Sequence, residues 1–445
     1  MTKQQNTLKI EANPTKDLFI NMLVKDITLK DAIGDLVDNS VDGARSNTQD
    51  KKDLSQFFIK ILAGEDLFVI EDNCGGIESK TAREHAFRFG RPETYTPTPG
   101  SIGQFGIGMK RAFFKIGRDI EIKSKASTSD FFLKIDVLKW RKDEKKWFFE
   151  FNELNENVKH ELKDTGTKIS VSSLTEEAKS LINDKKFIND LISEISLEQM
   201  LNINRGLKIS INGSILTAPA ITLQQSEDLK PYFFTHTFPS SLTVRILAGV
   251  SEDNSEDGGW YVFCNDRLIM GRDRSVDTGW TGKYGDGVAE YHDQFYRFRG
   301  YAFFYADDVS KLPWNTTKTN MNVDSPEYKF VRSKMIEAMK LIMTLLNKLK
   351  QEKEKGNPTV NQVLNNRIND IVPVPVANIL TDTSTLNNKF QFPQIASAPP
   401  KSTETIISYK ISNEKFKKAK DYLDVSKPAD VGLMTFNYFF ENEIG

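Results

Sequence analysis

Cysteine and histidine are scarce in this sequence. Its 445 residues include two cysteines, Cys74 and Cys264, and four histidines. Two cysteines are too few for a disulfide framework, which agrees with a reducing compartment. The scattered histidines and cysteines also show no spacing that is typical of a zinc site. The chain is therefore not expected to be a disulfide-rich or a zinc-finger protein.

Long apolar runs are missing as well. No segment approaches the roughly 20 apolar residues that cross a bilayer, and residues 1–14 contain no apolar core of a signal peptide. With 39% hydrophobic and 27% charged residues, the composition is that of a soluble globular protein. We therefore expect a cytoplasmic protein without membrane contacts. A net charge of −1 gives no global attraction to nucleic acid, although a local basic patch remains possible.

The alternation of helical and strand patterns predicts an α+β protein of several parts. An Asn212-Gly213 hairpin signal and a long helix that Ser325 caps fall in the second of these parts. The tail is expected to form a strand over 405–412 and two helices after it. The expected parts are an α/β sandwich at 1–180, a second α/β domain at 181–356, a flexible Pro-rich linker at 357–402 and a small dimerisation or docking module at 403–445.

The first candidate site residues lie on a helix predicted over 28–45. Thr28 and Asp31 form a capping-box signal at its start. Asp35 and Asn39 are four residues apart, so they share the face opposite the apolar stripe. A carboxylate can deprotonate an attacking water, and an Asn carbonyl oxygen is a ligand that Mg²⁺ accepts. The alternative is the solvated polar face of an amphipathic helix.

Three further motifs follow along the chain. A strand ends at Asp72, before Gly75 and Gly76, where a carboxylate can accept a hydrogen bond from the amine of adenine. The glycine-rich stretch 100–108 runs into a helical pattern, which is typical of a phosphate-binding turn. Gly166-Thr167 opens a later strand. Taken singly, these motifs could be an ordinary strand-to-turn junction, a flexible surface loop and a simple turn.

Together and in this order, the four motifs resemble the boxes of the GHKL (Bergerat-fold) ATPase superfamily. That group includes gyrase B subunits, MutL-type proteins, heat-shock chaperones, MORC proteins and sensor histidine kinases. The resemblance covers about residues 1–180 and is closest to the MORC, chaperone and MutL-like branch. It implies an ATP-binding site in which Asn39 holds Mg²⁺, Asp72 reads adenine with help from Thr167, and residues 86–101 form a lid. Gly103 to Gly108 would wrap the phosphates, and Lys110 would lie near them. The further nucleotide-binding residues that the resemblance implies are Gly76, Gly103, Gln104, Phe105, Gly106, Ile107, Gly108, Met109 and Lys110.

Two positions depart from the family pattern. Asp35 stands where the family has glutamate, and one methylene less moves the carboxylate by more than about an ångström if the backbone is unchanged. The second box has Cys74 at its middle glycine position, while Asp72 and Gly76 keep their spacing. Cys74 is interpreted as a small buried residue and not as a nucleophile.

The second domain adds Lys318, in a Thr-Thr-Lys-Thr loop before the long helix. This loop resembles the transducer loop of gyrase and MutL relatives, which implies that Lys318 contacts the γ-phosphate; the alternative is an exposed basic loop. The resemblance implies an ATP-driven, dimer-closing switch with Asp35 and Lys318 as catalytic residues. The main alternative is an ATP-binding scaffold that does not hydrolyse ATP and regulates a partner protein. A homodimer is expected, and a protein partner, DNA or a role in bacterial defence is a hypothesis.

Overall fold

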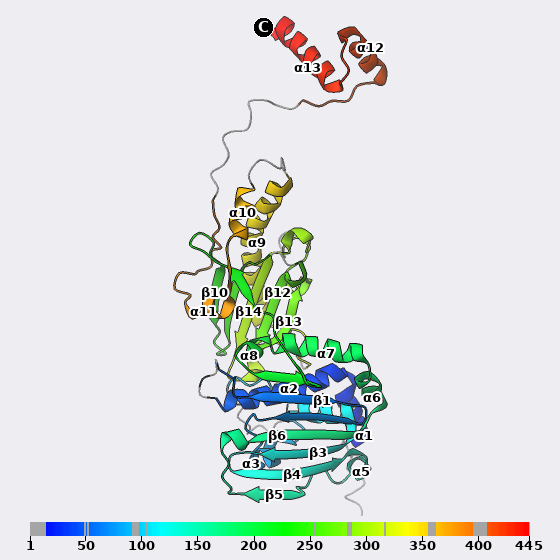
Figure 1. The fold of residues 1–445 in the computed structure, drawn as a ribbon, viewed down its shortest axis with the longest axis vertical. Coiled ribbons are helices and arrows are strands. Elements are labelled where there is room, and N and C mark those ends of the chain that lie inside the picture. Colours follow the sequence, from blue (N-terminus) through cyan, green and yellow to red (C-terminus); the bar gives the residue numbers. More distant parts are fainter. Residues whose placement is uncertain are drawn as a thin grey trace, which may run out of the picture. The chain divides into compact units, whose positions relative to one another are not determined.

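The structure is a computed structural model of the chain. It describes residues 15–48, 50, 53–90, 98–103, 106–252, 255–282, 287–315, 317–354, 362–394 and 407–444. The chain forms two compact units, Met1–Pro393 and Gln394–Gly445. The first unit contains two mixed β-sheets with helices, which confirms the expected α+β class (Figure 1).

The first sheet has eight strands in the order β5-β4-β3-β6-β2-β1-β7-β8. Its strands alternate between the core and the other face: in β4, Phe131, Leu133 and Ile135 are buried. The strands are β1 Phe58–Ala63, β2 Leu67–Asp72, β3 Gly117–Lys125, β4 Ser129–Asp136, β5 Glu153–Glu156, β6 Gly166–Leu174, β7 Lys208–Ile211 and β8 Ser214–Ile215.

Helix α2, Leu29–Ser46, is the element that positions the site. The capping box predicted at its start is present: the Thr28 side chain accepts from the Asp31 amide, and the Asp31 side chain accepts from the Thr28 amide. Its apolar stripe, with Ile33 and Val37 fully buried, joins the core of the first sheet. The other helical segments of this region are α1 Lys16–Lys25, α3 Ser79–Thr81, η2 Ala82–Ala86, α4 Gly108–Ile116, α5 Val137–Lys142, η3 Leu162–Asp164, α6 Glu176–Ile182, α7 Lys185–Glu198 and α8 Met200–Asn204.

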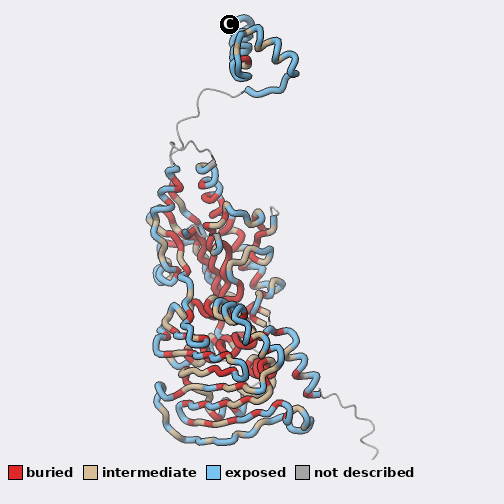
Figure 2. Tube along the Cα trace, turned by 45° about the vertical axis from the view of Figure 1, so that its right-hand side comes forward, coloured by how far each residue is buried: buried red, intermediate tan, exposed pale blue. Residues whose placement is uncertain are grey.

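The second sheet has five strands in the order β10-β11-β14-β12-β13. Helix α9, Pro326–Glu354, packs against it through Tyr328, Val331 and Met335, and the Ser325 hydroxyl accepts from the Tyr328 amide at its start. Figure 2 shows buried positions through both sheets of this unit. The strands are β10 Tyr232–Thr237, β11 Thr243–Val250, β12 Gly259–Cys264, β13 Arg267–Asp273 and β14 Phe298–Tyr305.

Two expected boundaries are wrong. The Asn212-Gly213 hairpin joins β7 to β8, and β7 pairs in parallel with β1, so these strands extend the first sheet past the boundary expected at 180. Residues 362–394 are not part of the flexible linker that is expected over 357–402. There α10 (Val363–Asn369), β15 (Pro373–Pro375) and α11 (Val376–Thr381) pack on the second domain, and β15 pairs with β9 (Thr222–Gln224). Apolar residues of this segment, such as Ile368 and Val376, are buried, so the segment is packed although it contains prolines.

The second compact unit contains α12 (Asn413–Leu423), α13 (Pro428–Phe439) and η8 (Phe440–Ile444). Two helices were expected here and are present. The strand expected over 405–412 is not formed by residues 407–412, and 405–406 lie outside the described residues. Val431 is the buried apolar residue among those described in this unit, whereas Leu433, Phe436 and Tyr438 are exposed.

Candidate nucleotide-binding site

The first part of the candidate site is a cavity of about 440 Å³ beside helix α2. Asp35, Asn39 and Asp42, one turn apart, line it. Asn39 is exposed, so its side-chain oxygen can meet a ligand in the cavity. Asp35 is buried, with 4% of its surface exposed. The predicted pair therefore faces one space and is not a solvated helix face.

The glycine-rich stretch forms the opposite wall. Gly103, Gly106, Ile107, Gly108, Met109 and Lys110 line the cavity, and Gly108 begins helix α4. A Cβ at Gly108 would lie 3.1 Å from the Asp35 carboxyl carbon, so any larger residue would have to displace this carboxylate by a few tenths of an ångström. The Lys110 ammonium donates to the main-chain oxygens of Ala86 (2.8 Å) and Gly106. Gln104 and Phe105 lie outside the described residues.

Asp72 lies in an adjoining space of about 60 Å³, which Gly76, Met109 and Thr167 also line. Its carboxylate accepts from the Ser40 hydroxyl (2.6 Å), the Cys74 amide (2.9 Å) and the Thr167 amide (3.2 Å). Burial raises the pKa of Asp72, and these donors only partly offset the rise. The space holds about two water molecules. A purine is larger, so its entry requires flexible neighbours such as Met109 to move.

Cys74 is buried beside Asp72, with 2% of its surface exposed. Burial raises the pKa of its thiol, so the reactive thiolate is disfavoured. A Cβ at Gly76, where φ is +70°, would collide with the Lys125 carbonyl oxygen at 2.2 Å. Glycine is therefore required at position 76 of the second box, where the main chain passes close to β3.

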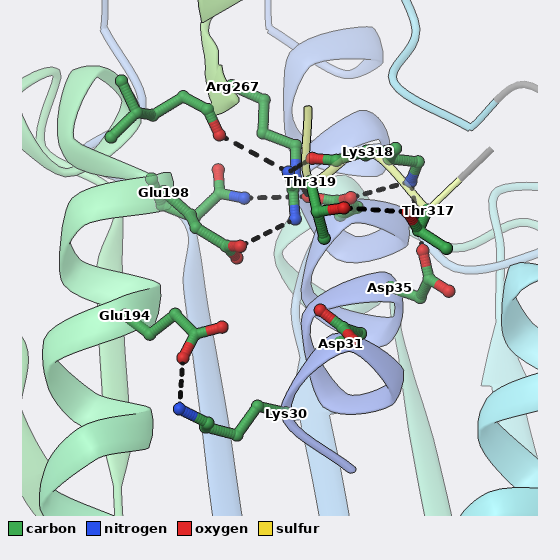
Figure 3. A network of polar contacts seen from close by, with 12 residues as sticks. Lys30, Asp31, Asp35, Glu194, Glu198, Arg267, Thr317, Lys318 and Thr319 are labelled. Carbon is green, nitrogen blue, oxygen red and sulfur yellow. Dashed lines mark hydrogen bonds and ion pairs between the residues drawn. The ribbon is translucent and has the colours of Figure 1, made fainter. Parts of the chain in front are cut away.

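Lys318 reaches the same cavity from the loop before α9, 283 residues after Asp35. Its ammonium donates to Asp38 Oδ2 (2.8 Å) and to Asp35 Oδ1 (3.2 Å), while Arg111 Nε donates to Asp35 Oδ2 at 2.5 Å. Figure 3 shows Lys318 and Asp35 pointing toward one another. Lys318 is 6% exposed, so the alternative of an exposed basic loop is wrong. Both Asp35 oxygens thus have cationic partners.

These partners set the charge of Asp35. Burial alone would raise its pKa, but Lys318 and Arg111 outweigh burial and hold the pKa below its ordinary value. Burial likewise favours the neutral form of Lys318, yet Asp38 and Asp35 raise the pKa of the ammonium. The pair is therefore ionised, and Asp35 is present as a carboxylate.

The end of the expected lid is held at its base. The Asp42 carboxylate accepts from the Ile102 amide (2.7 Å) and the Gly103 amide (2.9 Å), and Asn265 Nδ2 donates to the Ser101 oxygen (3.0 Å). Burial raises the pKa of Asp42 to about 6, although the two amides oppose the shift. Helix α2 and the β12–β13 turn thus both hold residues 101–103 at the edge of the cavity.

The sequence analysis did not identify several residues of the site. Asp38 and Arg111 stand next to predicted residues, whereas Arg267 opens β13, an apolar strand that no prediction covered. A charged residue within such a strand was the available signal, because a buried arginine needs partners for its donors. Their pairing depends on how the two sheets meet, which local sequence does not state.

Comparison with known families agrees with this geometry. Residues 27–168 match the family described as histidine kinase-, DNA gyrase B-, and HSP90-like ATPase. The match supports placing this segment in the GHKL superfamily and implies that it binds ATP. It covers Asp35 to Thr167 and leaves the second sheet and Lys318 outside. The comparison with curated proteins finds no match.

Two absences apply to the part of the chain that the structure describes. No helix there combines the length and apolarity needed to span a bilayer. No three His, Cys, Asp or Glu side chains gather there in a way that could hold a metal ion. If Mg²⁺ binds in the cavity, Asn39 would contribute one ligand, and phosphate oxygens and water would supply the others.

Proposed function

We propose that this chain binds Mg-ATP and hydrolyses it slowly, and that the cycle switches its conformation. One observation carries the proposal: Asp35, Asn39, Gly108 and Lys318 line a single cavity although Lys318 lies 283 residues after Asp35. In this arrangement Asp72 would bind the adenine amine and Thr167 would assist it. The loop amides and Lys110 would lie along the phosphates.

The residues also define a chemical step. Asp35 would accept a proton from water as the water oxygen attacks the γ-phosphorus, and ADP would leave. Lys318 would balance the charge that develops on the γ-phosphate oxygens. Mg²⁺ would neutralise phosphate charge when bound. For this step Lys318 has to exchange Asp35 for phosphate, which links turnover to a movement of the second domain.

The same contacts favour a second candidate function. Arg111 and Lys318 hold both Asp35 oxygens, and the aspartate is shorter than the family's glutamate. A chain in which Asp35 never leaves these partners would bind ATP without turnover and act as a scaffold for a partner protein. Only measured turnover separates the two functions.

Steady-state Mg-ATP hydrolysis by the wild type, Asp35→Asn and Asp72→Asn tests the proposal. We expect turnover in the wild type, ATP binding without turnover in Asp35→Asn, and loss of binding in Asp72→Asn. Binding without turnover in the wild type would favour the scaffold. No binding of adenine nucleotide by the wild type would overturn both functions.

The proposal extends to assembly. A homodimer that closes when ATP orders the lid would fit the MORC, chaperone and MutL-like branch, and the helices of the C-terminal unit would join two copies or dock a partner. Lys415, Lys417, Lys418 and Lys420 on α12 could instead contact DNA phosphates. A cytoplasmic location, a DNA-linked role and a role in defence stay predictions.

A further inference from the structure

Arg267 occupies the centre of a buried charge cluster between helix α2 and the second sheet. It is the first residue of β13 and is 4% exposed. Its Nε donates to Asp38 Oδ1 (2.9 Å), and its Nη2 donates to Glu198 Oε1 (3.0 Å). Its Nη1 donates to the main-chain oxygen of Lys318 (3.0 Å). One guanidinium therefore ties together α2, α7 and the lysine loop (Figure 3).

Lys318 has an unusual backbone in this cluster. Its φ is +58°, a left-handed conformation that non-glycine residues rarely adopt and that surrounding contacts must hold. The Lys318 carbonyl accepts from Arg267, while its ammonium shares the Asp38 carboxylate with Arg267, one oxygen each. Arg267 thus fixes both ends of Lys318, the main chain directly and the side chain through Asp38.

We propose that Arg267 is a positioning residue that holds Lys318 in the conformation from which its ammonium reaches the γ-phosphate of ATP. The inference rests on the proposed ATP site and concerns how that site is regulated. Because Arg267 contacts both α2 and the Lys318 loop, recognition of the γ-phosphate would depend on how the second sheet packs on α2. Arg267 is not among the residues that line the cavity, so it would act on the nucleotide only through Lys318.

The charges of the cluster support such an exchange. The Asp35 and Asp38 carboxylates face three cations, Arg111, Arg267 and Lys318. When Lys318 turns to phosphate, Arg111 stays on Asp35 and Arg267 stays on Asp38. Neither carboxylate is left buried without a cation, which would be strongly unfavourable. Without Arg267, departure of Lys318 would leave the Asp38 carboxylate buried without a cation. Lys318 would therefore stay on Asp38.

The test measures how strongly the full chain prefers a triphosphate. Affinities for Mg²⁺ with the non-hydrolysable β,γ-imido analogue of ATP and for ADP are compared in wild type, Lys318→Ala, Arg267→Gln and the double variant. A lost contact between charged groups should reduce the preference about tenfold or more in each single variant. The double variant should lose no more than either single variant, because both changes remove the same contact. This readout does not depend on turnover.

Two further variants keep the test decisive. Arg267→Lys retains the charge but cannot contact all three partners, so it should lose only part of the preference; it also serves if Arg267→Gln does not fold. Arg299→Gln is the matched control. Arg299 is equally buried in the same sheet and donates to the main-chain oxygens of Tyr296 and Phe298, so its change should leave the preference intact.

The outcomes separate the inference from the function on which it rests. Additive losses in the double variant, an unchanged preference in Arg267→Gln, or equal loss of affinity for both nucleotides would overturn the positioning role. A wild type that binds both nucleotides equally would overturn it too, because Lys318 would then make no γ-phosphate contact. A wild type that binds neither nucleotide would instead refute the proposed ATP site.

Discussion

Asp35 shows at the scale of the residue how this site departs from the pattern it resembles. The carboxylate is one methylene shorter than glutamate, and Arg111 and Lys318 occupy both of its oxygens. Gly108 lies against it, at the start of α4. The position of the carboxylate is therefore set by contacts on three sides, and a displacement there should affect catalysis before it affects folding.

A Gly108→Ala substitution tests this dependence. The new Cβ would lie 3.1–3.3 Å from the Asp35 carboxylate atoms, tighter than ordinary contact, so the carboxylate should shift by a few tenths of an ångström. We expect turnover to fall by roughly 10- to 100-fold with unfolding free energy changed by less than about 1 kcal/mol, since alanine suits a helix better than glycine. Gly432→Ala is the control, because nothing lies within 4 Å of its Cβ position. Unchanged turnover in Gly108→Ala would show that Asp35 is not held this tightly.

Glu198 gives a second prediction, on pH and stability. Burial raises its pKa from 4.5 to about 7, although Arg267 opposes the shift. Between these values the folded chain holds a proton at Glu198 that the unfolded chain has lost, so the free energy of unfolding falls as pH rises from 4.5 to 7. Glu198→Gln cannot ionise. Relative to the wild type, it should be about 2 kcal/mol more stable at pH 8 than at pH 5.

Urea unfolding of both proteins at pH 5 and pH 8 measures this difference. Glu161→Gln is the control, because the Glu161 side chain is 73% exposed and its removal should leave the pH dependence of the wild type. A difference between Glu198→Gln and wild type that does not change with pH would contradict the raised pKa.

At the scale of elements, the sequence indicates local structure more reliably than it indicates pairings between distant segments. The capping box at Thr28 and the cap at Ser325 depend on residues three positions apart, and both are present. The Asn212-Gly213 hairpin was recognised, but its parallel partner β1 lies about 150 residues earlier and no local signal names it. The same reason hid the ion pair between Asp38 and Lys318, whereas the four boxes were visible because each is a short motif. The prolines of 362–394 suggested a linker. Proline content does not indicate whether the apolar residues of a segment pack against the rest of the protein.

The turn between β12 and β13 is the element whose loss should loosen residues 98–103, next to the cavity. Asn265 and Asp266 have φ of +46° and +69°, as a tight hairpin requires. Asn265 Nδ2 donates to the oxygens of Ser101 and Ala306. In Asn265→Asp both donors are lost and a carboxylate faces two carbonyls. We expect faster amide exchange at 98–103 and about tenfold weaker ATP binding, a loss that corresponds to one or two buried hydrogen bonds.

Asn212→Asp is a matched control for that change. Asn212 also has a left-handed backbone, φ +49°, at a hairpin turn, and its Nδ2 donates to the Ala63 oxygen at 3.0 Å, away from the cavity. Its substitution should cost similar stability and leave exchange at 98–103 unchanged. Equal effects of the two variants on ATP binding would mean that the β12–β13 turn has no special role at the lid.

At the scale of the whole molecule, the chain has two compact units, and the cavity lies in the first of them. The cavity and all described site residues lie in Met1–Pro393, so this unit should bind nucleotide without the rest of the chain. The unit Gln394–Gly445 contributes none of them. Its helix α13 exposes Leu433 (62%), Phe436 (46%) and Tyr438 (71%), a pattern that favours burial against another surface.

Deletion of residues 394–445 therefore separates assembly from binding. If the unit joins two copies, the full chain without nucleotide should have twice the mass of one chain by light scattering, and the deletion variant should be a monomer with nucleotide affinity within about twofold, since its cavity is intact. Leu433→Lys with Phe436→Lys should also give a monomer, because two charges would have to be buried in the interface. Lys417→Ala with Lys418→Ala serves as the control: it should keep the mass and weaken only DNA binding, if the α12 lysines contact phosphates. A deletion variant with unchanged mass and unchanged DNA affinity would leave the unit without either role, and ATP-driven closure would have to be carried by Met1–Pro393 alone.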